Sequence, residues 1–407
     1  MRRLLAHRNT RLYLSGQVVS LFGDSALWLA MGIWIKVLTG SSAAAGLSFF
    51  ALALGSLCGP LGGLLADKVR RRPLLIAVNL VTAGLVLLLL LVRDRHQVWL
   101  IYAVMFGYGV SGSVLGPAQT ALVQAIVPAG LLGEANSVLQ TAQQGLRLVT
   151  PLAGAGLFAA FGPAPVIIGD AATFLIAVAT LLAIRMREDH PEPAAERWLT
   201  QLTAGARHIA RTVVLRQLTI TAAVVVTAYG LSETVPFAVV SQGLHKPAAF
   251  LGILISAQGI GAIAAGVAAV PLIRALSEGL LASLGMIAAA LGYLLLIAAR
   301  LPAVLAGCAL LGASLSWIIV GIITLLQRRT PPGLMGRTDA AFTIAYAVPQ
   351  TIAIALGAAL IAVLNYRILL LAIAGLMTLA AAYLATRREQ RRAAATPAPE
   401  PAPADAP

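Results

Sequence analysis

The segment Gly63-Leu-Leu-Ala-Asp67-Lys-Val-Arg70-Arg71-Arg72 joins two long apolar runs, Ala43–Ala66 and Pro73–Val92. Neither run contains a charged residue, whereas the segment ends with one acid and four basic residues. Each run is about as long as a helix that crosses a hydrocarbon core of about 30 Å. We therefore expect the segment to be a short loop at a membrane surface, between two spanning helices.

The composition of the whole chain also indicates a membrane protein. Its 407 residues are 59% hydrophobic and 11% charged, and the mean hydropathy is +0.89. A soluble domain is about 45–50% apolar and about 25% charged, so the composition excludes a cytosolic globular enzyme and a disordered protein. The two cysteines, Cys58 and Cys308, exclude a disulfide scaffold and a cysteine-based metal site.

Twelve apolar runs are long enough to span a membrane. We expect helices rather than barrel strands, because the runs are long and almost free of charge. No cleavable signal peptide is expected, because the first run is longer than a signal-peptide core and further spans follow it. The predicted spans are Leu12–Leu38, Ala43–Ala66, Pro73–Val92, Val98–Ala121, Asn136–Ala160, Val166–Ile184, Gln217–Val240, Ala248–Ile273, Gly279–Ala299, Pro302–Leu326, Ala340–Val363 and Ile368–Ala385.

The basic residues are divided very unequally between the two sides of the predicted membrane. With twelve spans both termini lie on one side, which receives 22 of the 29 Lys and Arg residues, while the other side receives six. The positive-inside rule makes the richer side cytoplasmic. Topology thus explains the net charge of +14 without a nucleic-acid partner. The preference for Arg over Lys indicates a bacterial plasma membrane.

A polar stretch separates two similar halves. Residues 185–216 hold six Arg and four acids, which predicts a cytoplasmic linker with an amphipathic helix on the membrane surface. We expect the Ala- and Pro-rich end of the chain to be disordered. The predicted organisation is a six-helix bundle over 1–184, the linker over 185–216, a second six-helix bundle over 217–386 and a basic, then Ala/Pro-rich tail over 387–407.

The two bundles are similar in sequence. Pro128-Ala-Gly-Leu-Leu-Gly-Glu-Ala-Asn136 follows the fourth span, and Pro331-Pro-Gly-Leu-Met-Gly-Arg-Thr-Asp339 follows the tenth, 203 residues later. Because each copy has an even number of spans, the copies have the same orientation in the membrane. The predicted fold class is an all-α membrane protein with twelve transmembrane helices in two parallel six-helix pseudo-repeats.

The charged segment Gly63–Arg72 resembles the signature G-x-L-a-D-r-x-G-R-K/R of the major facilitator superfamily. Gly63, Asp67, Arg71 and Arg72 match it between spans 2 and 3, whereas Arg70 replaces a glycine. The resemblance implies the major facilitator fold and a secondary transporter. In that family the acid of the signature faces the N-terminus of span 11, where a helix dipole favours an acid.

The resemblance also implies a gate at the cytoplasmic side. Span 11 begins here near Asp339, which could also meet Arg71 or Arg72. Gly63 allows helices to approach closely. We expect these residues and Asp67 to form a latch that closes the cytoplasmic side during the transport cycle.

Span 5 contains Arg147-Leu-Val-Thr-Pro151-Leu-Ala-Gly154-Ala-Gly156, which resembles the antiporter motif G-x-x-x-G-P-x-x-G-G. Thr150 and Ala155 replace two of its glycines, and a packing helix with Pro and small residues is the alternative. Further stretches, including Gly116-Pro117-Ala118 and Gly169-Asp170-Ala-Ala-Thr-Phe174, are similar to the branch that holds macrolide-efflux and enterobactin-exporter proteins. Members of that branch mostly export drugs, siderophores or secondary metabolites with the proton gradient.

Asp24 is the strongest candidate for proton coupling. It is the thirteenth residue of the first span, about 18 Å from its start and close to the midplane. Charges at that depth are costly and usually functional. Gln17 and Trp28 share a helical face with Asp24, together with Ser20 and Met31. We expect this face to line a cavity that binds apolar molecules.

Three other charged residues lie within predicted spans. Arg147 lies at a depth similar to Asp24 and is therefore a further candidate for the proton-coupling and substrate site. Alternatively, Arg147 and Asp24 form an ion pair that only fixes packing. Glu233, about 24 Å along span 7, is either a second proton site or a solvated acid near the outer surface. Asp170 lies near the beginning of span 6, where the helix N-terminus stabilises an acid, so we interpret it as structural.

The sequence indicates no enzymatic chemistry. All five histidines fall in predicted loops or in the linker, and neither a Walker A lysine motif nor a Gly-x-Ser-x-Gly elbow occurs. We therefore expect no catalytic residue, no cofactor and no metal.

The expected function is proton-coupled multidrug efflux, of the kind that confers antibiotic resistance, by a monomer. Its partners would be a small-molecule substrate, protons and the lipid bilayer. Two alternatives remain, a proton symporter that imports a metabolite or lipid, and a non-transporting membrane scaffold or sensor.

Overall fold

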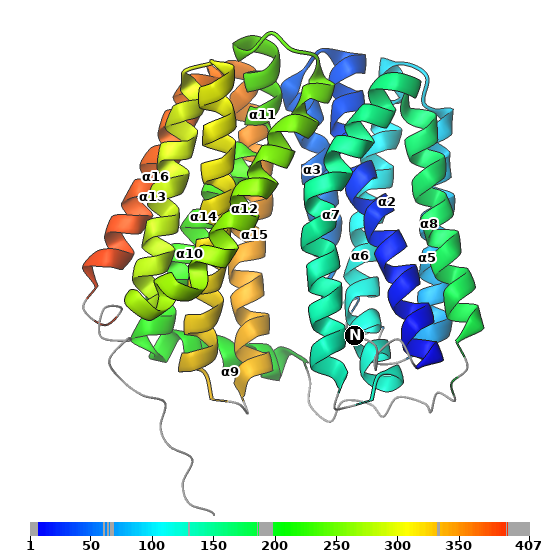
Figure 1. Ribbon diagram of the computed structural model, residues 1–407, viewed down its shortest axis with the longest axis horizontal. Helices are drawn as coiled ribbons and strands as arrows, with labels where there is room; N and C mark the ends of the chain where they lie inside the picture. The colour runs from blue at the N-terminus through cyan, green and yellow to red at the C-terminus, as the bar shows by residue number, and fades with distance from the viewer. Residues whose placement is uncertain are drawn as a thin grey trace, which may run out of the picture. The chain divides into compact units, whose positions relative to one another are not determined.

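The computed structural model describes residues 7–59, 62, 65, 69–128, 131–184, 186, 198–331, 334–387 and 389, and no β-strand occurs among them. The helices of the first part of the chain (Figure 1) are α2 Arg8–Thr39, α3 Ser42–Ser56, α5 Arg71–Leu88, α6 Val98–Ile126, α7 Leu132–Phe161 and α8 Pro163–Ala183. They are followed by α9 Trp198–Arg211, α10 Val213–Ser232, α11 Val235–Ala238, α12 Leu251–Ala275, α13 Glu278–Ile297, α14 Leu301–Arg329, α15 Met335–Val363 and α16 Tyr366–Thr386.

Ten helices in the described part of the chain are long and apolar enough to cross a membrane. They coincide with ten of the predicted spans. The other two predicted spans, Ala43–Ala66 and Asn136–Ala160, coincide with shorter apolar stretches, Ser42–Ser56 and Val149–Phe161. The structure therefore shows a multi-pass helical membrane protein, while the count of twelve spans and the two six-helix repeats stay predictions.

The predicted seventh span is not a single regular helix. Helix α10 ends at Ser232, and a turn at Glu233 and Thr234 separates it from α11. Pro236 explains the break, because it has no N–H to donate and its ring would collide with the carbonyl group of Ser232 in a continuous helix. After α11 the chain forms a π-helical turn over Val239–Gly243.

Contacts in space divide the chain into two compact units. The first combines Met1–Ala195 with Gly230–Ser256 and Thr351–Leu369, and the second comprises Glu196–Tyr229, Ala257–Gln350 and Leu370–Pro407. In the first unit, α2 packs against α7 and α8, α3 against α6, and α5 against α6 and α8. Helix α11 also belongs to the first unit and contacts α3. The predicted domains are continuous segments with boundaries at residues 185 and 217, whereas each compact unit combines several segments. The predicted domain boundaries stay a prediction.

Close helix contacts also hold the second unit together. Helix α13 packs along α14. Gly261 of α12 lies directly against the backbone of Ala309 in α14, and the indole of Trp317 donates a hydrogen bond of 3.0 Å to the carbonyl group of Ala265. The linker contributes α9, whose Gly205 lies against the backbone of α15 at Arg337.

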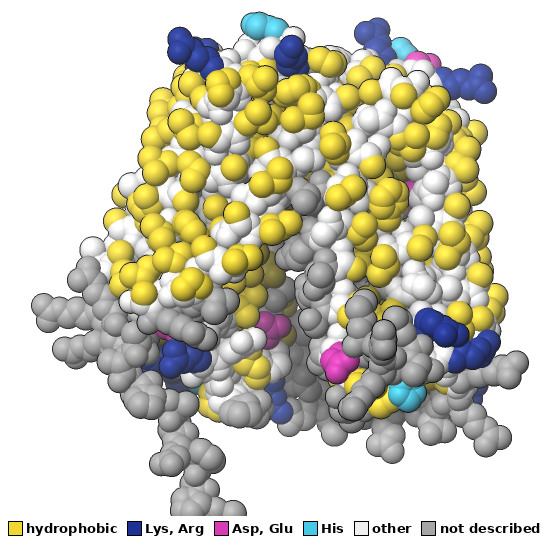
Figure 2. Space-filling model, viewed as in Figure 1, with side chains coloured by type: hydrophobic (Ala, Val, Ile, Leu, Met, Phe, Trp, Pro, Cys, Tyr) yellow, Lys and Arg dark blue, Asp and Glu magenta, His cyan; other side chains and the backbone are white. Residues whose placement is uncertain are grey.

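The outward-facing surface of the helices matches a membrane environment. On the face seen in Figure 2, Lys and Arg side chains gather near the two ends of the helices, and apolar side chains cover the surface between them. Large apolar side chains are widely exposed, as at Val267 (75%), Val363 (79%) and Leu379 (69%). Such surface is unfavourable in water and favourable in lipid.

Candidate functional site

Asp24 lies in the middle of α2, where a tyrosine of α6 binds its carboxyl group. The hydroxyl group of Tyr108 donates a hydrogen bond of 2.6 Å to Oδ1 of Asp24. Asp24 is half-buried, and no Lys or Arg among the described residues forms an ion pair with it. The ring of Tyr108 packs edge-on against Phe174 of α8, with the ring centroids 5.8 Å apart. The hydrogen bond offsets part of the cost of an anion at this depth.

A second acid, Asp170 of α8, lies beside Asp24. Its Oδ1 is 2.5 Å from the position that a Cβ atom would take on Gly23. Asp170 is 1% exposed, and neither of its carboxyl oxygens has a hydrogen-bond partner within the described residues. Because Gly23 precedes Asp24 in the chain, both acids lie at the same contact between α2 and α8. Three helices thus bring together two acids and one tyrosine hydroxyl group.

Two glycines in α2 allow the close approach to α8. A Cβ atom on Gly16 would collide with Thr180, and a Cβ atom on Gly23 would collide with Thr173. Both the glycines and the threonines are seven residues apart, so the two antiparallel helices stay in register over two turns. This contact places Asp170 next to the backbone of α2.

Sequence reasoning missed the position of Asp170. The helix-dipole interpretation assumed that this acid lies in the first turn of its helix. In the structure α8 begins at Pro163, so Asp170 is the eighth residue, beyond the first turn where the dipole acts. The seven-residue spacing of Gly16 and Gly23 was the available signal, because small residues at such spacing mark close helix contacts.

Trp28 belongs to an aromatic cluster one helical turn beyond Asp24. Its ring centroid is 4.9 Å from that of Phe49 on α3, and Phe49 is 6.0 Å from Phe237 on α11. Gly32 makes room for this cluster, because a Cβ atom there would lie 2.7 Å from the ring of Phe237. Phe49 and Phe237 are buried, so half-buried Trp28 is the member of the cluster with an exposed part.

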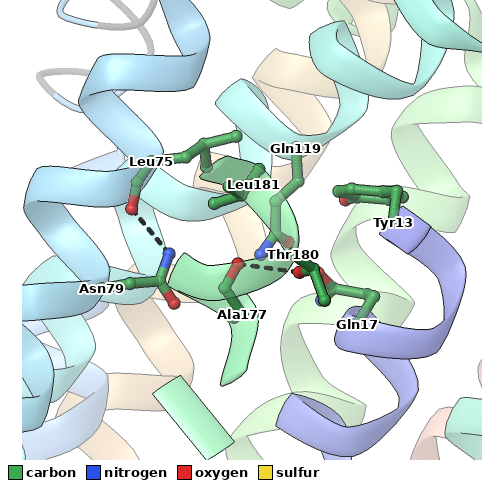
Figure 3. A pocket seen from close by; sticks show the side chains of 8 residues that line it. All are labelled: Tyr13, Gln17, Leu75, Asn79, Gln119, Ala177, Thr180 and Leu181. Carbon is green, nitrogen blue, oxygen red and sulfur yellow. Dashed lines mark hydrogen bonds between the residues drawn. The ribbon is translucent and has the colours of Figure 1, made fainter. Parts of the chain in front are cut away.

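Gln17 faces a narrow pocket inside the first unit. The pocket has room for about one water molecule. Gln17 lies seven residues, about 10 Å along α2, from Asp24. The lining residues belong to α2, α5, α6 and α8. Figure 3 shows their amide, hydroxyl and apolar groups around the pocket: Tyr13, Gln17, Leu75, Asn79, Gln119, Ala177, Thr180 and Leu181.

Glu233 lies at the break between α10 and α11. It is half-buried, and no hydrogen bond or ion pair of its side chain is found in the described part of the chain. The next residue, Thr234, is fully buried (0% exposed) and its methyl group lies against Gly46 of α3. Glu233 and Asp24 belong to the same compact unit.

The signature loop contributes a helix cap that the sequence did not reveal. Arg72 donates hydrogen bonds from Nε to the carbonyl group of Leu181 at 2.8 Å and from Nη2 to that of Leu182 at 2.9 Å. Both carbonyl groups lie at the C-terminal end of α8, where the helix dipole favours a cation. Arg72 therefore joins α5 to α8.

The predicted latch is not tested by the structure. Gly63 and Asp67 lie outside the described residues. Arg71 is the first residue of α5, and Asp339 is exposed in the second turn of α15. The role of these four residues and of Arg72 in gating stays a prediction.

The motif in α7 takes part in helix packing. Pro151 is buried, and a Cβ atom on Gly154 would lie 3.0 Å from the backbone of Ala26 in α2. Gly154 thus allows α7 to approach the helix that carries Asp24. The side chain of Arg147 lies outside the described residues, so its predicted pairing with Asp24 remains open.

The second unit contains an ion pair near one end of its helices. Arg328 of α14 donates to Oε1 of Glu278, the first residue of α13. The Glu278 side chain is 4% exposed and that of Arg328 is 44% exposed. Within the residues that the structure describes, no three His, Cys, Asp or Glu side chains gather as they would around a metal ion.

The fold defines a multi-pass helical membrane protein with acids inside its helices, and comparison with known families gives its class. The sequence profile of the Major Facilitator Superfamily matches residues 13–346. The chain therefore belongs to this superfamily.

Individual relatives are more distant. The chain is 28% identical over 178 residues to macrolide efflux protein A of Streptococcus pyogenes, an alignment that covers 42% of this chain and 43% of that protein. The matched part of the chain thus spans less than half the length of this curated relative.

Solved structures show the same fold. A bacterial homologue of the iron transporter ferroportin superposes with a TM-score of 0.69 at 16% identity, covering 94% of this chain and all of the other. The peptide transporter family member PepTSo superposes with a TM-score of 0.72 at 12% identity, covering 93% and 97% of the two chains. At these identities the likeness extends to the fold alone.

Proposed function

We propose that this Major Facilitator Superfamily transporter exports a small apolar or amphipathic molecule in exchange for protons. The observation that supports the proposal is Asp24, an acid in the middle of α2 that is bonded to Tyr108 and has no ion-pair partner in the described residues. A side chain of this kind within a membrane helix is a functional candidate by default. It can carry a proton because its charge is costly when water is excluded and acceptable when water enters.

The proposed cycle uses this difference. When the site opens to the outside, Asp24 takes up a proton, and the neutral carboxylic acid is compatible with a closed, dry site. When the site opens to the cytoplasm, water solvates the carboxylate and the proton leaves. Each pH unit contributes about 1.4 kcal/mol, and each 100 mV about 2.3 kcal/mol per charge. One proton therefore drives uphill export of a neutral substrate.

The substrate class follows from the aromatic cluster and the curated relative. Trp28, half-buried one turn from Asp24 and backed by the buried rings of Phe49 and Phe237, offers an aromatic face for an apolar ring system. The relative named macrolide efflux protein A favours export. We propose a drug, siderophore or secondary metabolite as substrate, with multidrug efflux and antibiotic resistance as the physiological outcome.

The proposed architecture is that of twelve spans in two parallel six-helix repeats, 1–184 and 217–386, joined by the linker 185–216. Both termini are cytoplasmic, the membrane is a bacterial plasma membrane and the functional unit is a monomer. In this arrangement Asp67 of the signature loop and Asp339 of α15 control closure of the cytoplasmic side. The Asp67→Asn variant should be expressed at the normal level but should export substrate more slowly. Export by this variant at the wild-type rate would refute the latch.

Transport in inside-out membrane vesicles tests the proposed function. Vesicles from cells that express the chain are energised by an imposed proton gradient and offered a panel of labelled macrolides and fluorescent dyes. We expect accumulation of at least one compound that stops when an uncoupler dissipates the gradient. Accumulation that persists with the uncoupler would contradict proton coupling, and substrate that moves in the same direction as protons would establish symport instead.

A further inference from the structure

We infer that Asp170 is the second carboxyl group of the proton site, and that Asp24 and Asp170 together take up one proton in each transport cycle. The inference rests on the proposed function, because it assigns a further residue to the proposed proton exchange. It makes the proton site a property of the contact between α2 and α8 rather than of α2 alone.

Burial and the absence of partners distinguish Asp170 from a structural acid. Structural carboxylates are usually satisfied by hydrogen bonds or by a cation. Asp170 is 1% exposed, yet both of its oxygens lack a hydrogen-bond partner among the described residues. Its position in the third turn of α8 also removes the explanation by the helix dipole. An unsatisfied buried acid needs another explanation, and a proton provides one.

The neighbourhood of Asp170 provides the coupling to Asp24. Gly23, the residue before Asp24, packs so closely that a Cβ atom added to it would lie 2.5 Å from Oδ1 of Asp170. Two carboxylates in a water-poor site repel each other strongly. Such a pair ionises in two separate steps, which belong to the pair and not to either residue.

The charged and titratable groups around the pair are few. On α2 the group is Asp24, and on α6 it is Tyr108, whose hydroxyl group donates to Asp24. On α5, Arg72 lies at the far end of α8, bound to the carbonyl groups there. On α7, Arg147 is the charged residue at comparable depth, and its side chain lies outside the described residues. Among the described residues, Asp24, which follows Gly23 at the contact with Asp170, is therefore the charged neighbour that the structure assigns to Asp170.

The proton balance is simple. In the outward-open state one proton from external water forms an O–H bond with either carboxylate, so the pair carries a single negative charge. In the inward-open state water enters the site, and the O–H bond of the protonated carboxyl group breaks. The proton leaves to cytoplasmic water, and water solvates the two carboxylates that remain. Tyr108 keeps its own proton throughout and only donates its hydrogen bond to Asp24.

Infrared titration of the purified protein tests the pairing without any substrate. The carbonyl stretch of protonated carboxyl groups is followed with pH in wild type, Asp24→Asn and Asp170→Asn. We expect two coupled steps in wild type and one step in each variant, with a midpoint displaced by about one pH unit, a tenfold change in proton affinity. The step that disappears in Asp24→Asn is the titration of Asp24. If its midpoint is the same in Asp170→Asn as in wild type, the two acids are independent and the inference is wrong.

A pair of glycine variants separates a proton-carrying role from a packing role. Gly23→Ala pushes against Asp170 and Thr173, whereas Gly16→Ala pushes against Thr180 alone in the same interface. We expect both variants to lose similar thermal stability, but only Gly23→Ala to shift the pH midpoint of transport in vesicles. Equal pH profiles of the two variants would show that Asp170 only packs.

The outcomes also distinguish this inference from the proposed function. If wild-type vesicles show no exchange of protons for any probe compound, the proposed function fails regardless of the titration. If wild type exchanges protons and Asp170→Asn keeps both the wild-type pH midpoint and the wild-type rate, the proposed function stands and the role of Asp170 is refuted.

Discussion

The hydroxyl group of Tyr108 on α6 donates a hydrogen bond of 2.6 Å to Oδ1 of Asp24 on α2. The bond joins two helices that are far apart in the sequence, and it reaches an acid in the middle of a predicted membrane span. Hydrogen bonds to charged groups contribute about 1.5–3 kcal/mol. Under the proton exchange that we propose, Tyr108 therefore takes part in setting the pH at which Asp24 releases its proton.

Removal of this hydroxyl group should change the pH dependence of transport. Tyr108→Phe keeps the ring that packs against Phe174 but removes the donor to Asp24. Because the carboxylate loses a stabilising hydrogen bond, we expect the pH midpoint of proton-driven export to rise by about one unit, with normal expression. The measurement is export in vesicles as a function of pH, and a pH profile identical to wild type would contradict a functional bond.

The contact between Gly46 of α3 and Thr234 at the break after α10 should be intolerant of a larger side chain. A Cβ atom on Gly46 would collide with the methyl group of Thr234. We expect Gly46→Ala to lower stability by about 1–3 kcal/mol, as measured by thermal unfolding in detergent. Thr234→Ser in the same chain removes the methyl group and should restore most of the loss.

Gly84→Ala is the matched control for this contact. Gly84 lies within α5, and nothing lies within 4 Å of the position that its Cβ atom would take. Its replacement should leave stability unchanged or raise it slightly, because Ala favours a helix. Equal losses at Gly46 and Gly84 would show that the contact with Thr234 is not the cause.

The pair of Glu278 and Arg328 should show strong thermodynamic coupling. Arg328→Met leaves the buried carboxylate of Glu278 without its partner, so we expect a loss of about 1–3 kcal/mol, reduced by the partial exposure of Arg328. Glu278→Gln in the same chain removes the unpaired charge and should recover part of that loss. Additive losses in the double-mutant cycle would contradict a direct interaction.

Cysteine labelling tests the predicted topology. In a chain with Cys58 and Cys308 replaced by Ala, Thr203→Cys places a thiol on α9 and His96→Cys places one between α5 and α6, at positions that are both exposed. An impermeant maleimide should label position 96 in intact spheroplasts, and position 203 only after permeabilisation. Labelling of position 203 in intact spheroplasts would reverse the predicted orientation.

The sequence predicted the helical class well because a membrane span leaves a strong signal. Long apolar runs bounded by charges located ten spanning helices, and the residues of the signature loop indicated the superfamily that the family profile confirms. Hydropathy alone could not reveal the break at Glu233 and Thr234, because Pro236 is tolerated in some membrane helices. Nor did it show that α3 ends at Ser56 and that a turn at Leu57 and Cys58 follows.

The site was only partly predictable from the sequence. Depth along the helix singled out Asp24, because distance from a span end follows directly from residue number. The partners of Asp24 depend on how helices pack, and Tyr108 lies 84 residues away in the chain. The contact of Asp170 with α2 was not predictable because its neighbour is the backbone at Gly23, a position without a side chain. The bonds from Arg72 to the end of α8 could not be predicted either, because they depend on how α5 and α8 pack; its role in the gate stays a prediction.

Transport by Asp24→Asn tests the central claim most directly. Proteoliposomes that contain wild type or Asp24→Asn are compared in uphill accumulation of a labelled compound driven by a proton gradient, and in exchange of the same compound without a gradient. We predict that Asp24→Asn loses uphill accumulation and keeps exchange, because an amide cannot ionise but fills the same space. Uphill accumulation by Asp24→Asn at the wild-type rate and with the wild-type pH dependence would contradict a proton-carrying role for Asp24 and leave Asp170 and Glu233 as the next candidates.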